Sequence, residues 1–100
     1  MVRHIVMWKL KNAAHGNTKT ENARIIKDML ETLNGKIREL VKLEVGIDFS
    51  ETENSADVVL YSEFLSKEDL AKYQAHPEHR AVVPFIPEAC TERRVVDYEI

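Results

Sequence analysis

The chain has few of the residues that build several common kinds of site. Its 100 residues include one cysteine, Cys90, so no internal disulfide can form, which agrees with a reducing compartment. Its three glycines are not clustered, so the sequence lacks the glycine-rich loops that hold phosphates and dinucleotides. These shortages exclude a disulfide framework and make nucleotide binding a poor hypothesis.

Long apolar runs and an excess of positive charge are also missing. The apolar runs at 5–8 and 58–61 are far shorter than the ~20 residues that a bilayer requires. The formal net charge is −3, and Lys and Arg are interleaved with Asp and Glu, so no basic surface for nucleic acid is indicated. The first residues enter a strand pattern without a signal peptide. We therefore expect a cytoplasmic protein with no membrane span and no nucleic-acid partner.

What remains is the composition of one folded domain over residues 1–100. Apolar residues make up 44% and charged residues 31% of the chain, a balance typical of globular domains and not of disorder. A chain of this length has room for one hydrophobic core.

The first half of the chain predicts one strand and one helix. Residues 3–10 are apolar at both odd and even positions until Lys9, which is typical of a strand covered on both faces. After a polar loop, Thr18 is followed three residues later by Glu21, the spacing of a capping box. Apolar residues then recur at helical spacing, so a helix is predicted over 19–33.

The second half predicts a hairpin, a helical region and a closing strand. The hairpin is indicated by strict alternation over 41–49 and by strand-forming residues over 57–65. A capping signature at Ser66 opens a short helix. The segment 78–89 contains two prolines and predicts a short or broken helix, and 95–100 predicts the last strand.

The resulting β-α-β-β-α-β order predicts an α+β, ferredoxin-like fold. Its simplest arrangement is a four-stranded antiparallel sheet with both helices on one face, because right-handed crossovers place them on the same side. The other face stays bare, although the first and third strands are apolar at both parities. A second copy of the chain is the simplest cover, so we predict a homodimer through the open sheet face.

The densest group of polar residues lies at 73–80. A neutral imidazole at His79 is suited to accept a proton near neutral pH, and the phenol of Tyr73 is suited to donate a hydrogen bond to a developing oxyanion. His79 and Tyr73 are therefore the candidate catalytic residues. We predict a ligand pocket between helices and sheet, with further residues His4, Val6, Trp8 and His76.

Each candidate also has a structural interpretation. Tyr73 fits a core aromatic, and His76 directly before Pro77 fits a helix N-cap. His76 and His79 have a spacing that suits a metal, but no third ligand is evident, so neither a metal nor a cofactor is predicted. Cys90 is interpreted as a small buried hydrophobe.

Five segments together resemble the stress-responsive A/B barrel, or Dabb, family. They are the opening 4–11, the stretch 43–50, the strand 57–64, the Tyr-Gln-Ala-His-Pro-Glu-His motif at 73–79 and the closing 96–98. The resemblance spans nearly the whole chain and implies a dimeric α+β barrel, in which two ferredoxin-like units press their open sheet faces together.

The resemblance also implies a site. Relatives include plant stress-associated proteins and a cyclase that closes a polyketide by aldol condensation. In that cyclase the motif tyrosine and last motif histidine serve catalysis and a strand-one histidine lines the pocket, which implies Tyr73, His79 and His4 here. The leading hypothesis is a pocket for a small carbonyl or aromatic compound, with cofactor-free lyase or cyclase chemistry. The alternatives are a non-catalytic stress-response or structural dimer and, on fold analogy, a cofactor-free monooxygenase.

Overall fold

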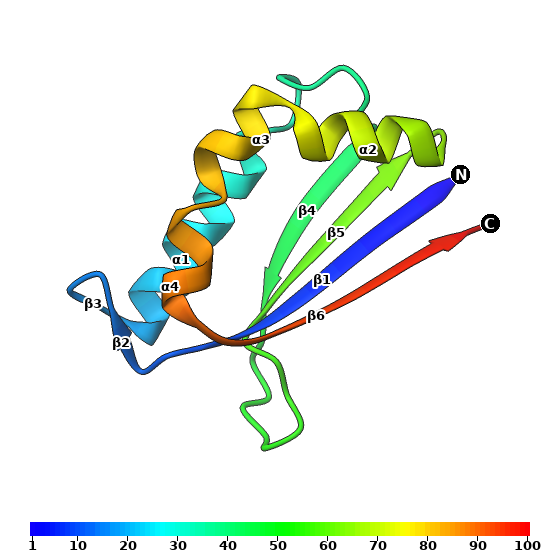
Figure 1. The fold of residues 1–100 in the computed structure, drawn as a ribbon. Helices are drawn as coiled ribbons and strands as arrows, with labels where there is room; N and C mark the ends of the chain where they lie inside the picture. Colours follow the sequence, from blue (N-terminus) through cyan, green and yellow to red (C-terminus); the bar gives the residue numbers. More distant parts are fainter.

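A computed structural model describes all residues, 1–100, as one sheet layer covered by one layer of helices (Figure 1). In chain order the elements are β1 (Val2–Leu10), β2 (Ala13–Ala14), β3 (Asn17–Thr18), α1 (Lys19–Glu31), β4 (Lys42–Ile47), β5 (Val58–Phe64), α2 (Lys67–Ala75), α3 (Pro77–Val82), α4 (Phe85–Ala89) and β6 (Cys90–Glu99).

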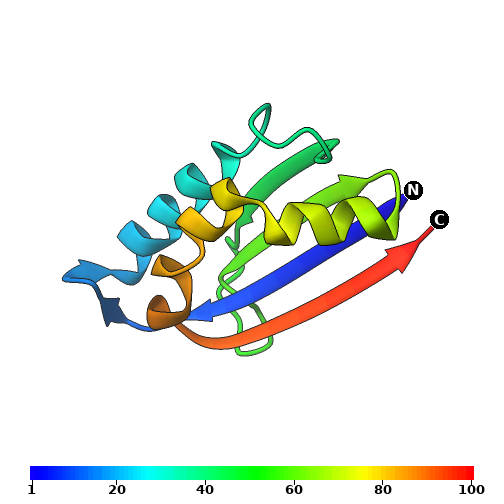
Figure 2. The same cartoon turned by 45° about the horizontal axis from the view of Figure 1, so that its top comes forward.

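The main sheet has four antiparallel strands in the order β4-β5-β1-β6. This order places the first and third strands of the β-α-β-β-α-β pattern at the centre, so the predicted ferredoxin-like fold is confirmed. Figure 2 shows all helices on the same side of this sheet. No helix is both long enough and apolar enough to cross a membrane, and the cytoplasmic location stays a prediction.

Two local features differ from the sequence prediction, whereas the predicted broken helix over 78–89 is present as α3 and α4. The predicted loop after β1 contains the small hairpin β2–β3. The last strand begins at Cys90 rather than near Val95. Residues 91–94 are polar and carry no strand periodicity, and their pairing with β1 is what makes them a strand.

The helix α1 begins as the capping box predicted. The Thr18 side chain accepts a hydrogen bond from the Glu21 backbone N–H, and the Glu21 carboxylate accepts one from the Thr18 backbone N–H. Ile26 and Leu30 on its inner stripe are buried in the core. The helix ends at Glu31, slightly before the predicted position, and the chain then turns with Gly35 at φ +80°.

Side chains of α1 and the following turn close the outer edge of β4. The Asn34 side chain donates to the Leu43 carbonyl at 2.9 Å and accepts from the Leu43 N–H at 3.2 Å. The Val45 N–H donates to the Glu31 carboxylate, and Lys27 donates to the Val45 carbonyl. Because an unpaired strand edge invites other chains to pair with it, these bonds protect this end of the sheet.

The helix-facing and open faces of the sheet differ in burial. On the helix side, even-numbered residues of β1 and β5 are buried in a core shared with α1 and α2. On the open side, Met7, Val96 and Tyr98 remain 40%, 48% and 42% exposed. The alternation over 41–49 is only partly borne out, since β4 ends at Ile47 and Phe49 lies beyond it with 93% of its surface exposed.

Replacing Asn34 by Ala tests whether side chains hold the β4 edge. Asn34→Ala removes two hydrogen bonds to the Leu43 backbone, so we expect the free energy of unfolding to fall by about 1 kcal/mol. Urea denaturation measures this change. Asn54→Ala, in the exposed loop between β4 and β5, is the matched control, and equal stability of the two variants would contradict the role of Asn34.

Candidate functional site

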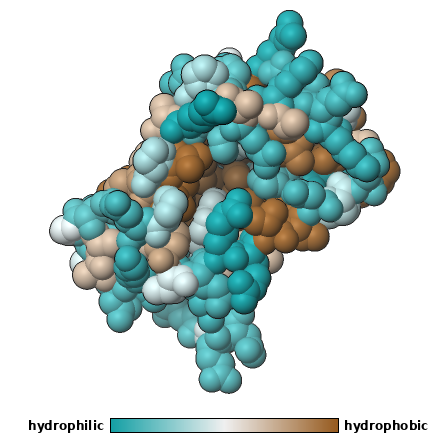
Figure 3. Space-filling view, viewed as in Figure 1, coloured by the Kyte–Doolittle hydropathy of each residue, from teal (hydrophilic) through white to brown (hydrophobic).

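A cavity of about 380 Å³ lies between the helix layer and strands β1 and β6. Most of its wall is apolar, and Figure 3 shows apolar side chains recessed between polar ones near the centre of this face. The wall consists of His4, Val6, Trp8, Leu30, Leu60, His79, Val83, Ile86, Pro87, Cys90, Thr91, Glu92 and Arg93. This volume is at the lower end of the range for small-molecule sites.

The cavity exists because the helices do not cover β6. Every residue of β6 after Cys90 is exposed, whereas the neighbouring β1 is buried at each even-numbered position. The short helices α3 and α4 bring Val83 and Ile86 over β1 and stop short of the edge strand. The space between them and β6 therefore opens to solvent along the sheet edge.

His4 is held in the cavity wall by Asp97. The two residues lie directly opposite each other in the β1–β6 ladder. His4 is 4% exposed, and its Nδ1 lies 2.5 Å from Oδ1 of Asp97. A carboxylate at Nδ1 fixes the orientation of the ring and favours the tautomer with the proton on that nitrogen, which leaves Nε2 as the acceptor.

Tyr73 and His79 are brought together by the break between α2 and α3. Pro77 cannot donate a backbone hydrogen bond to continue α2, and His76 caps α3 by accepting from the Glu78 N–H. The chain changes direction there, and the ring centroids of Tyr73 and His79 lie 4.6 Å apart. The Tyr73 ring also meets His4 edge-on, with centroids 6.5 Å apart.

Two buried polar atoms at this contact have no hydrogen-bond partner within the protein. They are the hydroxyl of Tyr73, a residue with no exposed surface, and Nδ1 of His79. A buried polar group without a partner costs free energy, and most such groups in native proteins are paired. Two of them in one contact are unusual, and they make this contact the candidate functional site.

Burial shifts the pKa values of this pair in opposite senses. It raises the pKa of the Tyr73 phenol to about 12, so the hydroxyl stays protonated. It lowers the pKa of His79 below 6.5; the Gln74 backbone opposes this shift, and the nearby His4 and Arg93 add to it. The pair therefore presents a neutral imidazole and a neutral phenol near pH 7, one able to accept a proton and the other able to donate a hydrogen bond.

The predicted site residues occupy three kinds of place. His4, Val6, Trp8 and His79 lie in the cavity wall. Tyr73 is not part of the wall but contacts both wall histidines. His76 lies outside the wall, where its Nδ1 is engaged in capping α3.

Sequence reasoning missed the part of the wall that β6 supplies. Arg93 and Thr91 face the cavity, as does Cys90, whose pKa burial raises to about 11 so that the thiol stays protonated. The missing signal was the register of β6 against β1. No three His, Cys, Asp or Glu side chains converge as a metal site would require.

The lowered pKa of His79 predicts a pH-dependent stability. Its unfolded pKa is near 6.5 and its folded pKa is lower, so below about pH 6.5 the unfolded chain binds a proton that the folded chain does not. The free energy of unfolding should therefore fall more between about pH 7 and pH 5 in the wild type than in His79→Gln. Urea denaturation at each pH measures it.

A second histidine provides the control for that experiment. His15→Asn removes a histidine at a position with φ +53°, which asparagine tolerates well, together with its hydrogen bond to the Phe85 carbonyl and its contact with Glu88. Its free energy of unfolding should be lower than that of the wild type at every pH, but the fall between pH 7 and pH 5 should remain. A His79→Gln profile parallel to that of the wild type would show that His79 does not carry the effect.

The sheet order, the single helix layer and the cavity beneath it define a ferredoxin-like α+β domain. The sequence also matches the family model of the Stress Responsive A/B Barrel Domain over residues 2–100. The chain therefore belongs to the stress-responsive A/B barrel (Dabb) family. A comparison with curated proteins gives no match.

Solved structures share this fold over nearly the whole chain. A protein from Bacteroides fragilis, described as dimeric, of unknown function and ferredoxin-like, is 35% identical, with 99% of this chain and 95% of that chain covered and a TM-score of 0.87. A dimeric ferredoxin-like protein from Thermobifida fusca is 22% identical, with 99% and 90% covered and a TM-score of 0.81. A hydroxynitrile lyase from Passiflora edulis is 20% identical, with 99% and 92% covered and a TM-score of 0.80. The last two likenesses show the fold alone.

Proposed function

We propose that this protein binds a small carbonyl or aromatic compound in the cavity between its helices and sheet. The observation that carries the proposal is the unpartnered buried hydroxyl of Tyr73, which packs against His79 in the wall of a mostly apolar cavity. The apolar walls favour a ligand with an aromatic or aliphatic skeleton, and the few polar groups that converge on the cavity orient that ligand. A carbonyl oxygen gives the hydroxyl an acceptor.

The same groups suit a cofactor-free acid–base step on the bound compound. His79, neutral near pH 7, is the base that takes a proton from the carbon or hydroxyl next to the carbonyl. Tyr73, protonated at that pH, donates a hydrogen bond to the oxygen on which negative charge develops. His4, oriented by Asp97, offers Nε2 as a second acceptor in the wall.

A lyase or cyclase reaction is the class of chemistry that these groups would perform. Each of these reactions removes a proton, either from the carbon next to a carbonyl or from a hydroxyl. Each also needs stabilisation of the negative charge that develops on an oxygen. The structural neighbour from Passiflora edulis is named a hydroxynitrile lyase, and this supports the lyase class by analogy of fold.

Tyr73→Phe separates ligand binding from stability. Because the Tyr73 hydroxyl is buried without a partner, its removal should leave the melting temperature unchanged or raise it by several degrees. The same variant should weaken binding of an aromatic ketone such as acetophenone by about tenfold, the loss of one good hydrogen bond. Thermal unfolding and NMR titration measure the two effects.

The alternative, a non-catalytic structural dimer, predicts a different result. In that case a panel of small carbonyl and aromatic compounds shows no binding to the wild type, and His79→Ala lowers the melting temperature with no loss of binding to accompany it. His76→Ala is the comparison variant, because its loss removes the cap of α3 and should destabilise the chain under either function.

We further propose that the protein is a homodimer through the open sheet face. The face carries a band of apolar side chains from β1, β5 and β6, and relatives with this fold are described as dimeric. Leaving such a band in water forfeits about 25 cal/mol for each Å² of apolar surface. A second copy of the chain, related by a two-fold axis, carries the same apolar band and can bury this one.

Two adjacent valines of β6 test this interface. Val96 is on the open face and Val95 on the helix side, and they are 48% and 42% exposed. Val96→Lys should shift the sedimentation profile from dimer to monomer, because it places a charge in the interface, whereas Val95→Lys should stay dimeric. A wild-type protein that sediments as a monomer at micromolar concentration would refute the homodimer.

A further inference from the structure

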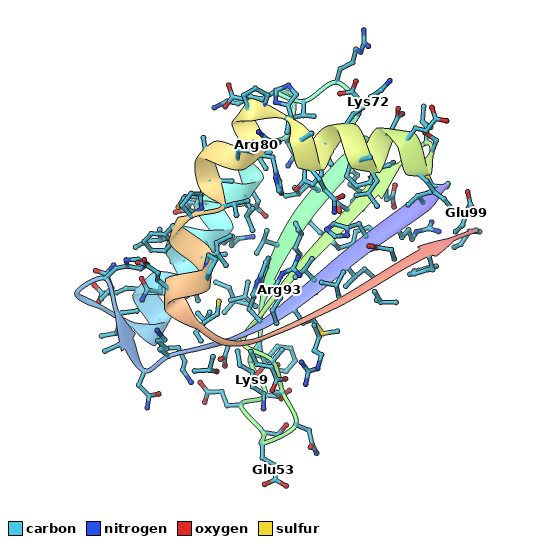
Figure 4. The ribbon with its side chains drawn as sticks, in the orientation of Figure 1. Lys9, Glu53, Lys72, Arg80, Arg93 and Glu99 are labelled. Atoms are coloured by element: carbon cyan, nitrogen blue, oxygen red, sulfur yellow. The ribbon has the colours of Figure 1, made fainter.

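Arg93 lies on β6 at the mouth of the cavity. It is directly opposite Trp8 in the β1–β6 ladder, so both side chains are on the helix side of the sheet. Figure 4 shows Arg93 on the side of β6 that faces the helices. Its charge is close enough to the other wall residues to add to the lowering of the His79 pKa and to offset part of the rise that burial causes in the Cys90 pKa.

The guanidinium of Arg93 has no acidic partner. No carboxylate of the chain lies within ion-pair distance of it, and its side chain donates no hydrogen bond to another residue. The neighbouring Arg94, which points to the open face, is paired with Glu92 at 3.8 Å.

Three acidic groups in or near the cavity wall are already engaged, the first being Asp57, which is paired with Lys19. Asp97 holds His4, and Glu92 in the wall is paired with Arg94. The remaining polar wall residues are histidines and Thr91, none of which carries negative charge. Arg93, which is exposed to solvent, is therefore the one arginine or lysine of the wall, and it has no acidic partner.

We propose that the ligand of this cavity is a small aromatic or keto carboxylate whose carboxylate is held by Arg93. The inference rests on the proposed function and names the class of compound it takes. A guanidinium presents two parallel N–H groups that match the two oxygens of a carboxylate, so it fixes position and orientation together.

The spacing along β6 sets the shape of the compound. Arg93 and Asp97 are four residues apart on the same face, which separates their Cα atoms by about 13 Å at 3.3 Å per residue. Arg93 and the imidazole of His4, which Asp97 holds, therefore lie at two ends of the same cavity wall. A rigid compound with a carboxylate and a carbonyl at opposite ends of an aromatic ring is the kind of ligand that approaches both.

A matched pair of probes tests the inference. 4-Acetylbenzoate carries a ketone and a carboxylate at opposite ends of a ring, and 4-acetylbenzamide is its neutral counterpart. The wild type should bind the benzoate about tenfold more tightly than the amide, by NMR titration and calorimetry. Arg93→Gln should abolish this preference with little change in amide affinity, and Arg93→Lys should retain part of it.

Arg24→Gln is the control, since it removes the same charge from an exposed position of α1 outside the cavity wall. It should keep the preference for the benzoate. Equal affinity for both probes, or a preference that survives Arg93→Gln, overturns the assignment of Arg93 and leaves the proposed pocket standing. If neither probe nor any neutral ketone shifts the resonances of His4 and His79, the proposed function itself fails.

Discussion

The pairing of β1 with β6 is the constraint on which the candidate site depends. This ladder places Asp97 opposite His4 and Arg93 opposite Trp8, all on the helix side of the sheet. Side chains alternate between faces, so a shift of one residue would move both β6 residues to the open face. The site therefore depends on backbone register as much as on the identity of its side chains.

The shortage of covering helices is the second constraint. One layer of helices covers one face of the sheet and stops short of β6, so the chain keeps two partly apolar surfaces uncovered. One is concave and small, the cavity, and the other is the broad open face. Their shapes suit different occupants, a small molecule in the first case and a second copy of the chain in the second. The opposite edge of the sheet, at β4, is closed by side chains of Asn34, Glu31 and Lys27, so it offers no site for a small molecule or for a second copy of the chain.

The break between helices at His76-Pro77 determines the geometry of the candidate site. It ends α2 and starts α3 in a new direction, and it thereby packs His79 against Tyr73. His76 contributes its side chain to the cap, while His79 is left with an unpartnered nitrogen. Two histidines in one motif thus have different tasks, and their surroundings in the fold distinguish them.

Periodicity, capping residues and prolines were sufficient to predict the order of the elements, since these signals are local and act through the backbone of a few neighbouring residues. The polar motif at 73–80 and the family resemblance pointed to His4, Val6, Trp8 and His79, all of which line the cavity. The contributions of Arg93 and Asp97 were decided only by tertiary structure. Polar residues on an exposed edge strand carry no apolar alternation, and only pairing with a strand some ninety residues earlier determines which way they point.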